Sequence, residues 1–115
     1  MQDVKTTITY KGKNYDLVFN FNVMEKIQDE YGSLEEWGKL TDGSAGEPNA
    51  KAVKFGYSAM LNEGISIYNE DNDADLPFFT LSQVGRIISE MGLVNATATM
   101  NQTVIDSTQS TEKNG

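Results

Sequence analysis

The chain contains no cysteine and no histidine among its 115 residues. Without cysteine it can form neither a disulfide nor a thiolate metal site, which fits a reducing compartment. Without histidine it lacks the usual general base and the commonest zinc ligand. An enzyme would therefore need a carboxylate-only or unusual metal-dependent site. No catalytic motif is present, and we assign no catalytic, cofactor-binding or metal-binding residue.

Positive charge and long apolar runs are also scarce. Nine Lys and Arg residues against 17 Asp and Glu give a formal net charge of -8, with no basic cluster to meet the phosphates of a nucleic acid. No window approaches the roughly 20 apolar residues of a membrane span, and residues 1–10 have no apolar run behind a basic segment. We therefore expect no nucleic-acid partner, no membrane partner, no secretory signal and a cytoplasmic location.

Length and hydrophobic content predict a single domain. Hydrophobic residues make up 38% of the chain and recur periodically, and a chain of this length commonly forms one domain. Residues 106–115 carry no large apolar side chain. We therefore expect one domain over residues 1–105 and a flexible polar tail over residues 106–115.

Two alternating segments near the N-terminus predict a β-hairpin. Every second side chain in residues 4–10 and 15–19 can face a core, on either side of a turn at residues 11–14. A stripe with spacings of three and four then predicts a helix that is capped near Asn20 or Asn22 and ends at Gly32. The members of this stripe are Phe21, Met24, Ile27 and Tyr31.

Two capping boxes predict further helix starts. In each box, a Ser or Thr hydroxyl accepts a hydrogen bond from the backbone N–H three residues later. The side chain of that later residue accepts a hydrogen bond from the backbone N–H of the Ser or Thr. Ser33 and Glu36 form the first box and open a short helix through residue 40. Thr80 and Gln83 form the second. Trp37, the only tryptophan, is expected to be buried and to anchor the short helix onto the hairpin.

Apolar spacing predicts the remaining helices. One begins near residue 50 and is expected to stop at Gly64, and another ends at Gly92. A Thr-rich segment over residues 93–105 suggests a weaker final helix. Residues 69–75 are expected to form an acidic loop. Together these elements predict an α+β fold in which an N-terminal hairpin packs against about four helices.

The acidic loop invites comparison with a calcium site. Asp71, Asp73 and Asp75 match the start of an EF-hand loop, D-x-D-x-D. The sixth position, which should be Gly, is Leu76, and the twelfth, which should be a bidentate Glu, is Ser82. Two decisive positions fail, so we predict a solvated loop and no specific calcium site.

Several linked segments resemble the tail assembly chaperones of long-tailed bacteriophages and gene transfer agents. The similarity concerns pattern and order over roughly residues 4–105. A strand at residues 15–21 runs into an Asn-led helix at residues 22–31, which is closed by Tyr31-Gly32. An Ala- and Leu-containing helix follows at residues 52–62, and a Thr-Leu-x-x-Val-Gly helix start lies at residues 80–85. Two departures are the long linker at residues 64–79 and the low Ala, Glu and Leu content of residues 93–105.

The resemblance implies a non-catalytic protein with a defined client. It would bind the tape measure protein, keep it soluble, and assist assembly of tail tube protein around it. It would act in the cytoplasm of the bacterial host and be absent from the mature virion. The resemblance implies an apolar groove between hairpin and helices, with client contacts from the exposed members of one set: Tyr31, Trp37, Phe78 and Phe79.

Alternatives remain open at the level of sequence. A structural tail or head-tail connector component, retained in the virion, is the second candidate. The chain could also form a homo-oligomer. Because members of this family are often also made in a frameshift-extended form, Glu112-Lys113-Asn114 is a candidate slip site, with a coincidental Lys-Asn pair as the alternative.

Overall fold

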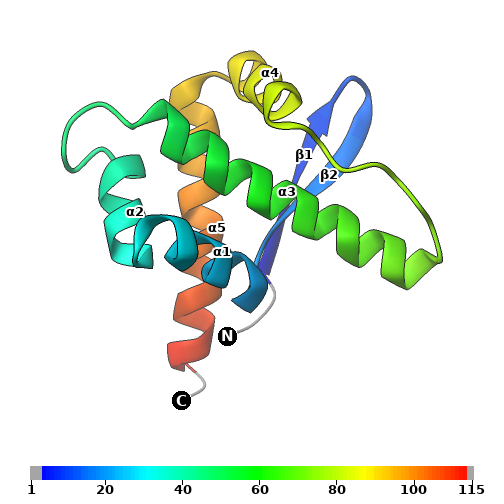
Figure 1. The fold of residues 1–115 in the computed structure, drawn as a ribbon, viewed down its shortest axis with the longest axis horizontal. Coiled ribbons are helices and arrows are strands. Elements are labelled where there is room, and N and C mark those ends of the chain that lie inside the picture. The colour runs from blue at the N-terminus through cyan, green and yellow to red at the C-terminus, as the bar shows by residue number, and fades with distance from the viewer. Residues whose placement is uncertain (1–3, 114–115) are drawn as a thin grey trace.

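The fold is α+β, as the sequence predicts, with five helices in the described part of the chain where about four were expected. The computed structural model describes residues 4–113, with side chains described for residues 5–108. The elements in chain order are β1 (Val4–Tyr10), β2 (Lys13–Phe19), α1 (Phe21–Tyr31), α2 (Leu34–Thr41), α3 (Ala50–Asn72), α4 (Leu81–Met91) and α5 (Leu93–Lys113). Figure 1 shows α3 crossing the middle of the molecule, with α5 behind it.

The two strands form an antiparallel hairpin closed by a tighter turn than expected. Thr6 pairs with Leu17, and Ile8 with Tyr15. The connecting loop is only Lys11-Gly12, and both residues have positive φ, 52° and 77°. This is the geometry of a type I′ turn, whose twist matches that of the flanking strands.

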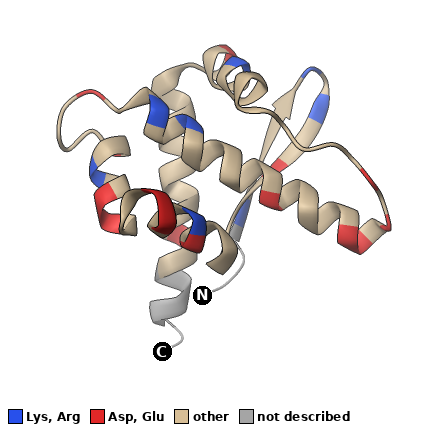
Figure 2. Ribbon diagram, in the orientation of Figure 1, with Lys and Arg blue, Asp and Glu red and all other residues tan. Residues whose placement is uncertain are grey.

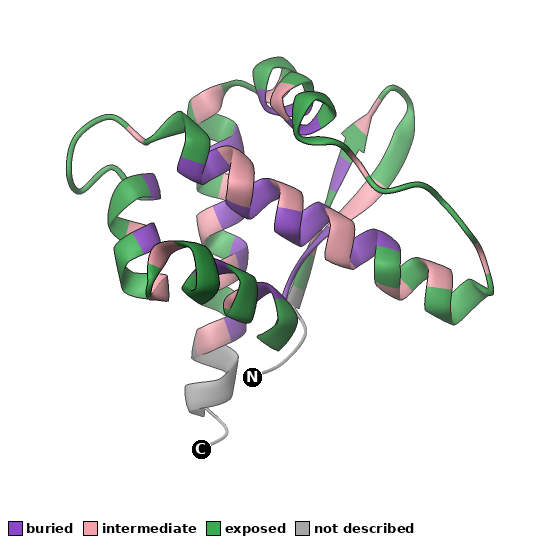
Figure 3. Cartoon of the chain, in the orientation of Figure 1, coloured by how far each residue is buried: buried purple, intermediate pink, exposed green. Residues whose placement is uncertain are grey.

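Helix α3 organises the hydrophobic core. It contacts β2 and all four other helices, so it buries side chains on several faces (Figure 3). Its last turns are exposed instead. The largest fully buried side chains of the described residues come from six elements and are Trp37, Tyr57, Phe19, Leu17, Ile27, Met60, Leu61, Ile87, Met100, Val23, Val53 and Val84.

Gly64 does not end the third helix, so that prediction was wrong. α3 continues to Asn72 and is capped by Asp73, whose φ is 50°. Gly64 is buried where α3 crosses β2, and a Cβ there would overlap the backbone oxygen of Asp16. Glycine at this position allows close packing of helix on strand, although it costs helix propensity. Residues 69–72, expected in an acidic loop, are consequently helical.

Trp37 is buried, as predicted, but against a different element. Its ring lies over Gly56 of α3, where a Cβ would overlap the indole. The indole N–H donates to the Ala52 carbonyl at 3.0 Å. Trp37 therefore fixes α2 to α3 rather than to the hairpin.

The first helix starts and ends where the sequence predicts. The Asn20 side chain caps α1 by accepting the Val23 N–H at 3.2 Å, and Gly32 ends the helix with φ 90°. Asn20 Nδ2 also donates to Glu63 of α3 at 2.7 Å, which joins this corner to the central helix. Phe21 departs from its predicted stripe, because its side chain is 71% exposed.

The second capping box forms in full, and the first forms in part. The Thr80 hydroxyl accepts the Gln83 N–H at 3.1 Å, and Gln83 Oε1 accepts the Thr80 N–H at 2.8 Å. The Ser33 hydroxyl accepts the Glu36 N–H at 3.0 Å. Both helices therefore begin with a satisfied amide at the expected residue.

The last helix is longer than predicted and continues past residue 105. α5 runs to Lys113, so residues 106–113 are helical rather than a loose tail; residues 114–115 lie outside the described part. Ser107 is fully buried and donates to the Phe19 carbonyl at 3.2 Å. Thr103 donates to the Thr99 carbonyl and meets the Thr6 hydroxyl at 2.6 Å. These small side chains let α5 approach the hairpin closely.

Candidate functional site

A groove lies between the hairpin, the C-terminal half of α3 and the segment that joins α3 to α4. We call this joining segment, residues 74–80, the strap. It leaves the exposed end of α3 and returns to α4 across the hairpin (Figure 1). The groove has a volume of about 460 Å³. Its lining residues are Lys13, Asn14, Tyr15, Asp16, Gly64, Ile65, Tyr68, Leu76, Pro77, Phe78, Phe79 and Gln83.

Two asparagines of α3, seven residues apart, hold the strap in place. Asn69 Oδ1 accepts the Leu76 N–H at 3.0 Å, and its Nδ2 donates to the Leu76 carbonyl at 3.1 Å. Asn62 repeats the arrangement with Phe79, at 2.8 and 3.1 Å. Each amide side chain thus takes the place of a backbone peptide group. Because residues seven apart lie on one face of a helix, both amides reach the same strap.

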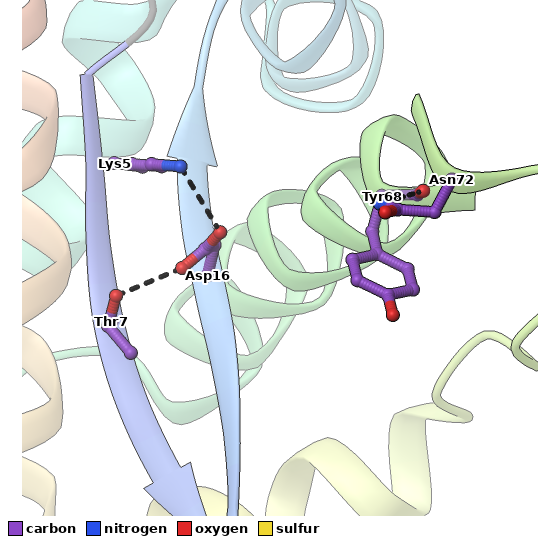
Figure 4. Close-up of polar contacts among 5 residues, drawn as sticks. All are labelled: Lys5, Thr7, Asp16, Tyr68 and Asn72. Atoms are coloured by element: carbon purple, nitrogen blue, oxygen red, sulfur yellow. Dashed lines mark hydrogen bonds and ion pairs between the residues drawn. The ribbon is translucent and has the colours of Figure 1, made fainter. Parts of the chain in front are cut away.

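Aromatic and aliphatic side chains form the groove walls. Tyr15 of β2 meets Phe79 edge to face, with ring centroids 4.9 Å apart. Figure 4 shows the Tyr68 ring projecting away from the last turns of α3, while Asn72 donates to the Tyr68 carbonyl behind it. Tyr68 is 50% exposed and Phe78 57% exposed. The groove therefore presents large apolar side chains to solvent.

The structure separates the four candidate contact residues. Phe78 and Phe79 both line the groove. Tyr31 lies elsewhere, with its ring edge to face against Phe55 of α3 at 5.5 Å. Its partial burial, with Glu30 nearby, raises the pKa of its phenol. Trp37 is only 1% exposed, so the expectation of a Trp37 contact requires correction: a packed core residue has no surface to offer.

Several groove residues were missed from the sequence, among them Tyr15, Tyr68 and Leu76. Tyr15 was assigned to the core of the hairpin, while Tyr68 and Leu76 fell beyond the helix end placed at Gly64. Extending α3 past Gly64 is what brings Tyr68 opposite the strap. The Asn62 and Asn69 spacing was the available signal, because asparagine on a helix face beside a Pro-containing loop can pair with loop backbone.

Charge is uneven along the groove. Glu70, Asp71, Asp73 and Asp75 cluster where α3 passes into the strap, and Lys13 lies on the hairpin at the other side (Figure 2). All four acidic side chains are exposed. Neither ion pair of the described residues, Lys5–Asp16 at 3.7 Å and Lys39–Glu35, involves them. The junction of α3 and the strap, next to the groove residue Leu76, therefore carries uncompensated negative charge, although none of these four side chains lines the groove itself.

The groove offers a surface with large apolar side chains, and the acidic junction of α3 and the strap lies beside it. Across the described residues, no group of three or more acidic side chains is arranged to hold a metal ion. None of the helices in residues 4–113 is both long and apolar enough to cross a membrane. No family model, curated protein or solved structure matches the chain.

Proposed function

We propose that this chain is a tail assembly chaperone of a long-tailed phage or gene transfer agent, which binds the tape measure protein non-catalytically. The observation that carries the proposal is the solvent-open groove with Tyr68, Leu76 and Phe78 between 46% and 57% exposed. Exposed apolar side chains gathered around one concavity mark a protein-binding surface. The sequence resemblance supplies the class of client.

The physical character of the chain suits this role. A tape measure protein is long and prone to helical association, so its chaperone must cover apolar surface while staying soluble itself. The net charge of -8 favours solubility. The chaperone would work in the bacterial cytoplasm with tail tube protein as a second partner.

Co-expression tests the proposal. The tape measure protein encoded by the same phage or prophage should be more soluble when this chain is present, and the two should co-purify. Purified virions should lack the chain. Stoichiometric recovery of the chain from mature particles would instead favour a structural tail or connector component, and unchanged solubility without co-purification would refute the chaperone role.

A further inference from the structure

The strap groove has features that define what it can bind. Leu76 and Phe79 already use their N–H and carbonyl groups in bonds to Asn69 and Asn62. Pro77 has no N–H to offer. Strand addition needs a row of free backbone donors and acceptors, and three of the four strap residues 76–79 have no free N–H to donate. The strap therefore offers an occupant its side chains and no continuous row of backbone groups.

The volume and lining of the groove suit the face of an amphipathic helix. A space of about 460 Å³ holds roughly two or three large apolar side chains. Side chains at positions i, i+3 or i+4 of a helix present such a set on one face. The half-exposed rings of Tyr68 and Phe78 would cover them from two sides.

Electrostatics determine the charge of the occupant. The C-terminal end of a helix carries partial negative charge and favours cations, yet α3 has no basic residue in its last turn. It has Glu70 and Asp71 there instead, followed by Asp73 and Asp75. Like charges at a helix end oppose its stability. A partner cation placed here would relieve that repulsion.

We infer that the strap groove binds an amphipathic helix whose apolar face is flanked by Lys or Arg at the end lying against Asp73 and Asp75. The inference deepens the proposed function and rests on it for the identity of the client, since it specifies which tape measure segments the chaperone would hold. The groove itself does not depend on the proposed function, because its lining residues follow from the structure.

A pair of model peptides tests the groove without assuming the client. We would titrate 14-residue Leu/Lys and Leu/Glu amphipathic helices of equal apolar content into the ¹⁵N-labelled chain. The Leu/Lys peptide should shift amide signals of β2, the end of α3 and the strap, and the Leu/Glu peptide should not. Shifts centred on the acidic faces of α1 and α2, or equal binding of both peptides, would overturn the inference.

Matched variants sharpen the test. Phe78→Ser should weaken Leu/Lys peptide binding about tenfold, as expected for loss of a central aromatic contact. Phe21→Ser is the control, because Phe21 is 71% exposed but lies outside the groove. The double variant Asp73→Asn/Asp75→Asn should bind the Leu/Lys peptide more weakly, and its binding should depend less on salt concentration. The control double variant Glu35→Gln/Glu36→Gln on α2 should change neither property. Equal effects within either pair would overturn the inference.

Tape measure fragments separate the two proposals. If overlapping fragments bind and Phe78→Ser changes nothing, the groove assignment fails while the chaperone role stands. If no fragment binds but the Leu/Lys peptide occupies the groove, the groove stands and the chaperone role fails. If both hold, the bound fragments should combine a short apolar face with basic residues at one end.

Discussion

Individual glycines act in opposite ways along the helices of this chain. At Gly56 and Gly64 the missing side chain lets Trp37 and the Asp16 backbone approach α3. Gly85 of α4 is different, because a Cβ there would lie 3.5 Å from Cδ of the Lys54 side chain, an ordinary contact with a flexible chain. The packing partner, rather than the residue type, therefore decides what a helical glycine contributes.

We expect Gly56→Ala to lower the free energy of unfolding by about 1–3 kcal/mol, because the added methyl forces the Trp37 ring out of its place. Gly85→Ala is the matched control and should raise it by about 0.5–1 kcal/mol through helix propensity. Urea denaturation followed by circular dichroism measures both. Similar effects of the two substitutions would contradict the packing described for Trp37.

Tyr57 makes stability depend on pH in the alkaline range. Burial raises the pKa of its phenol to about 12, above the value near 10 of an unfolded chain. The folded state thus holds its proton where the unfolded state loses it, so stability is intact below pH 10 and falls between pH 10 and 12. Tyr57→Phe should reduce this fall, and Tyr68→Phe, at an exposed site, serves as the control. An unchanged alkaline slope in Tyr57→Phe would refute the assignment.

At the scale of elements, the strap is an extended segment whose pairing partner is a helix. Asn62 and Asn69 supply from side chains the bonds that a neighbouring strand would supply from backbone. This fixes the groove wall without a third strand, and the backbone groups of Leu76 and Phe79 depend on these two side chains.

Asn69→Ala should therefore loosen the start of the strap. Loss of its two bonds, each worth about 0.5–1.5 kcal/mol, should speed amide exchange of Leu76 by roughly tenfold, as measured by NMR. Asn72→Ala is the control, because Asn72 bonds only the Tyr68 carbonyl within its own helix. If Leu76 exchange is the same in both variants, Asn69 does not hold the strap.

The C-terminal turns of α5 also belong to the folded unit. A chain ending at Ile105 should lose about 1–3 kcal/mol of stability, because the buried Phe19 carbonyl loses the Ser107 hydroxyl. A chain ending at Thr108 keeps Ser107 and should lose much less. Equal stability of the two truncations in urea would restore residue 105 as the domain boundary.

Short-range sequence patterns predicted which helices and strands are present better than they predicted where the helices end. The hairpin, the Asn20 cap and the Thr80 box depend on neighbouring residues, so the sequence alone was enough. Gly64 looked like a helix end because the crossing of α3 with β2, which requires glycine at this position, involves a residue that is distant in sequence. The length of α5 was missed for a similar cause, since Thr97, Thr103 and Thr108 bond carbonyls of the preceding turn, and α5 docks on the hairpin.

The same distinction applies to the candidate site. Phe78 and Phe79 were chosen with the resemblance as the only guide, and both line the groove. Trp37 could not be excluded as a contact, because its burial depends on Gly56 in another helix. Tyr68 required the full length of α3. The acidic residues were visible from the start, but their place at the groove was not.

At the scale of the whole molecule, net charge outweighs specific ion pairs. The two ion pairs of the described residues, Lys5–Asp16 and Lys39–Glu35, are solvent-exposed and contribute little. The formal charge of -8 makes overall repulsion the larger electrostatic effect on the folded state.

Salt should therefore stabilise the fold. Raising NaCl from about 20 to about 200 mM should increase the free energy of unfolding by roughly 0.5 kcal/mol or more, because screening reduces repulsion between acidic groups. A Glu35→Gln/Glu36→Gln variant, with less negative charge, should respond less. A fall in stability with salt would mean that attractive pairs dominate instead.

The burial of Trp37 also gives the protein an optical signal that is separate from the groove. Its indole rests on Gly56, twelve residues along α3 from Tyr68 of the groove, or about 18 Å at the rise of a helix. Excitation at the long-wavelength edge of the protein absorption band excites the indole alone. The emission wavelength therefore reports the environment of Trp37 in the protein interior. A partner that fills the groove should leave the emission wavelength unchanged, whereas a shift would show that binding loosens the packing around Trp37.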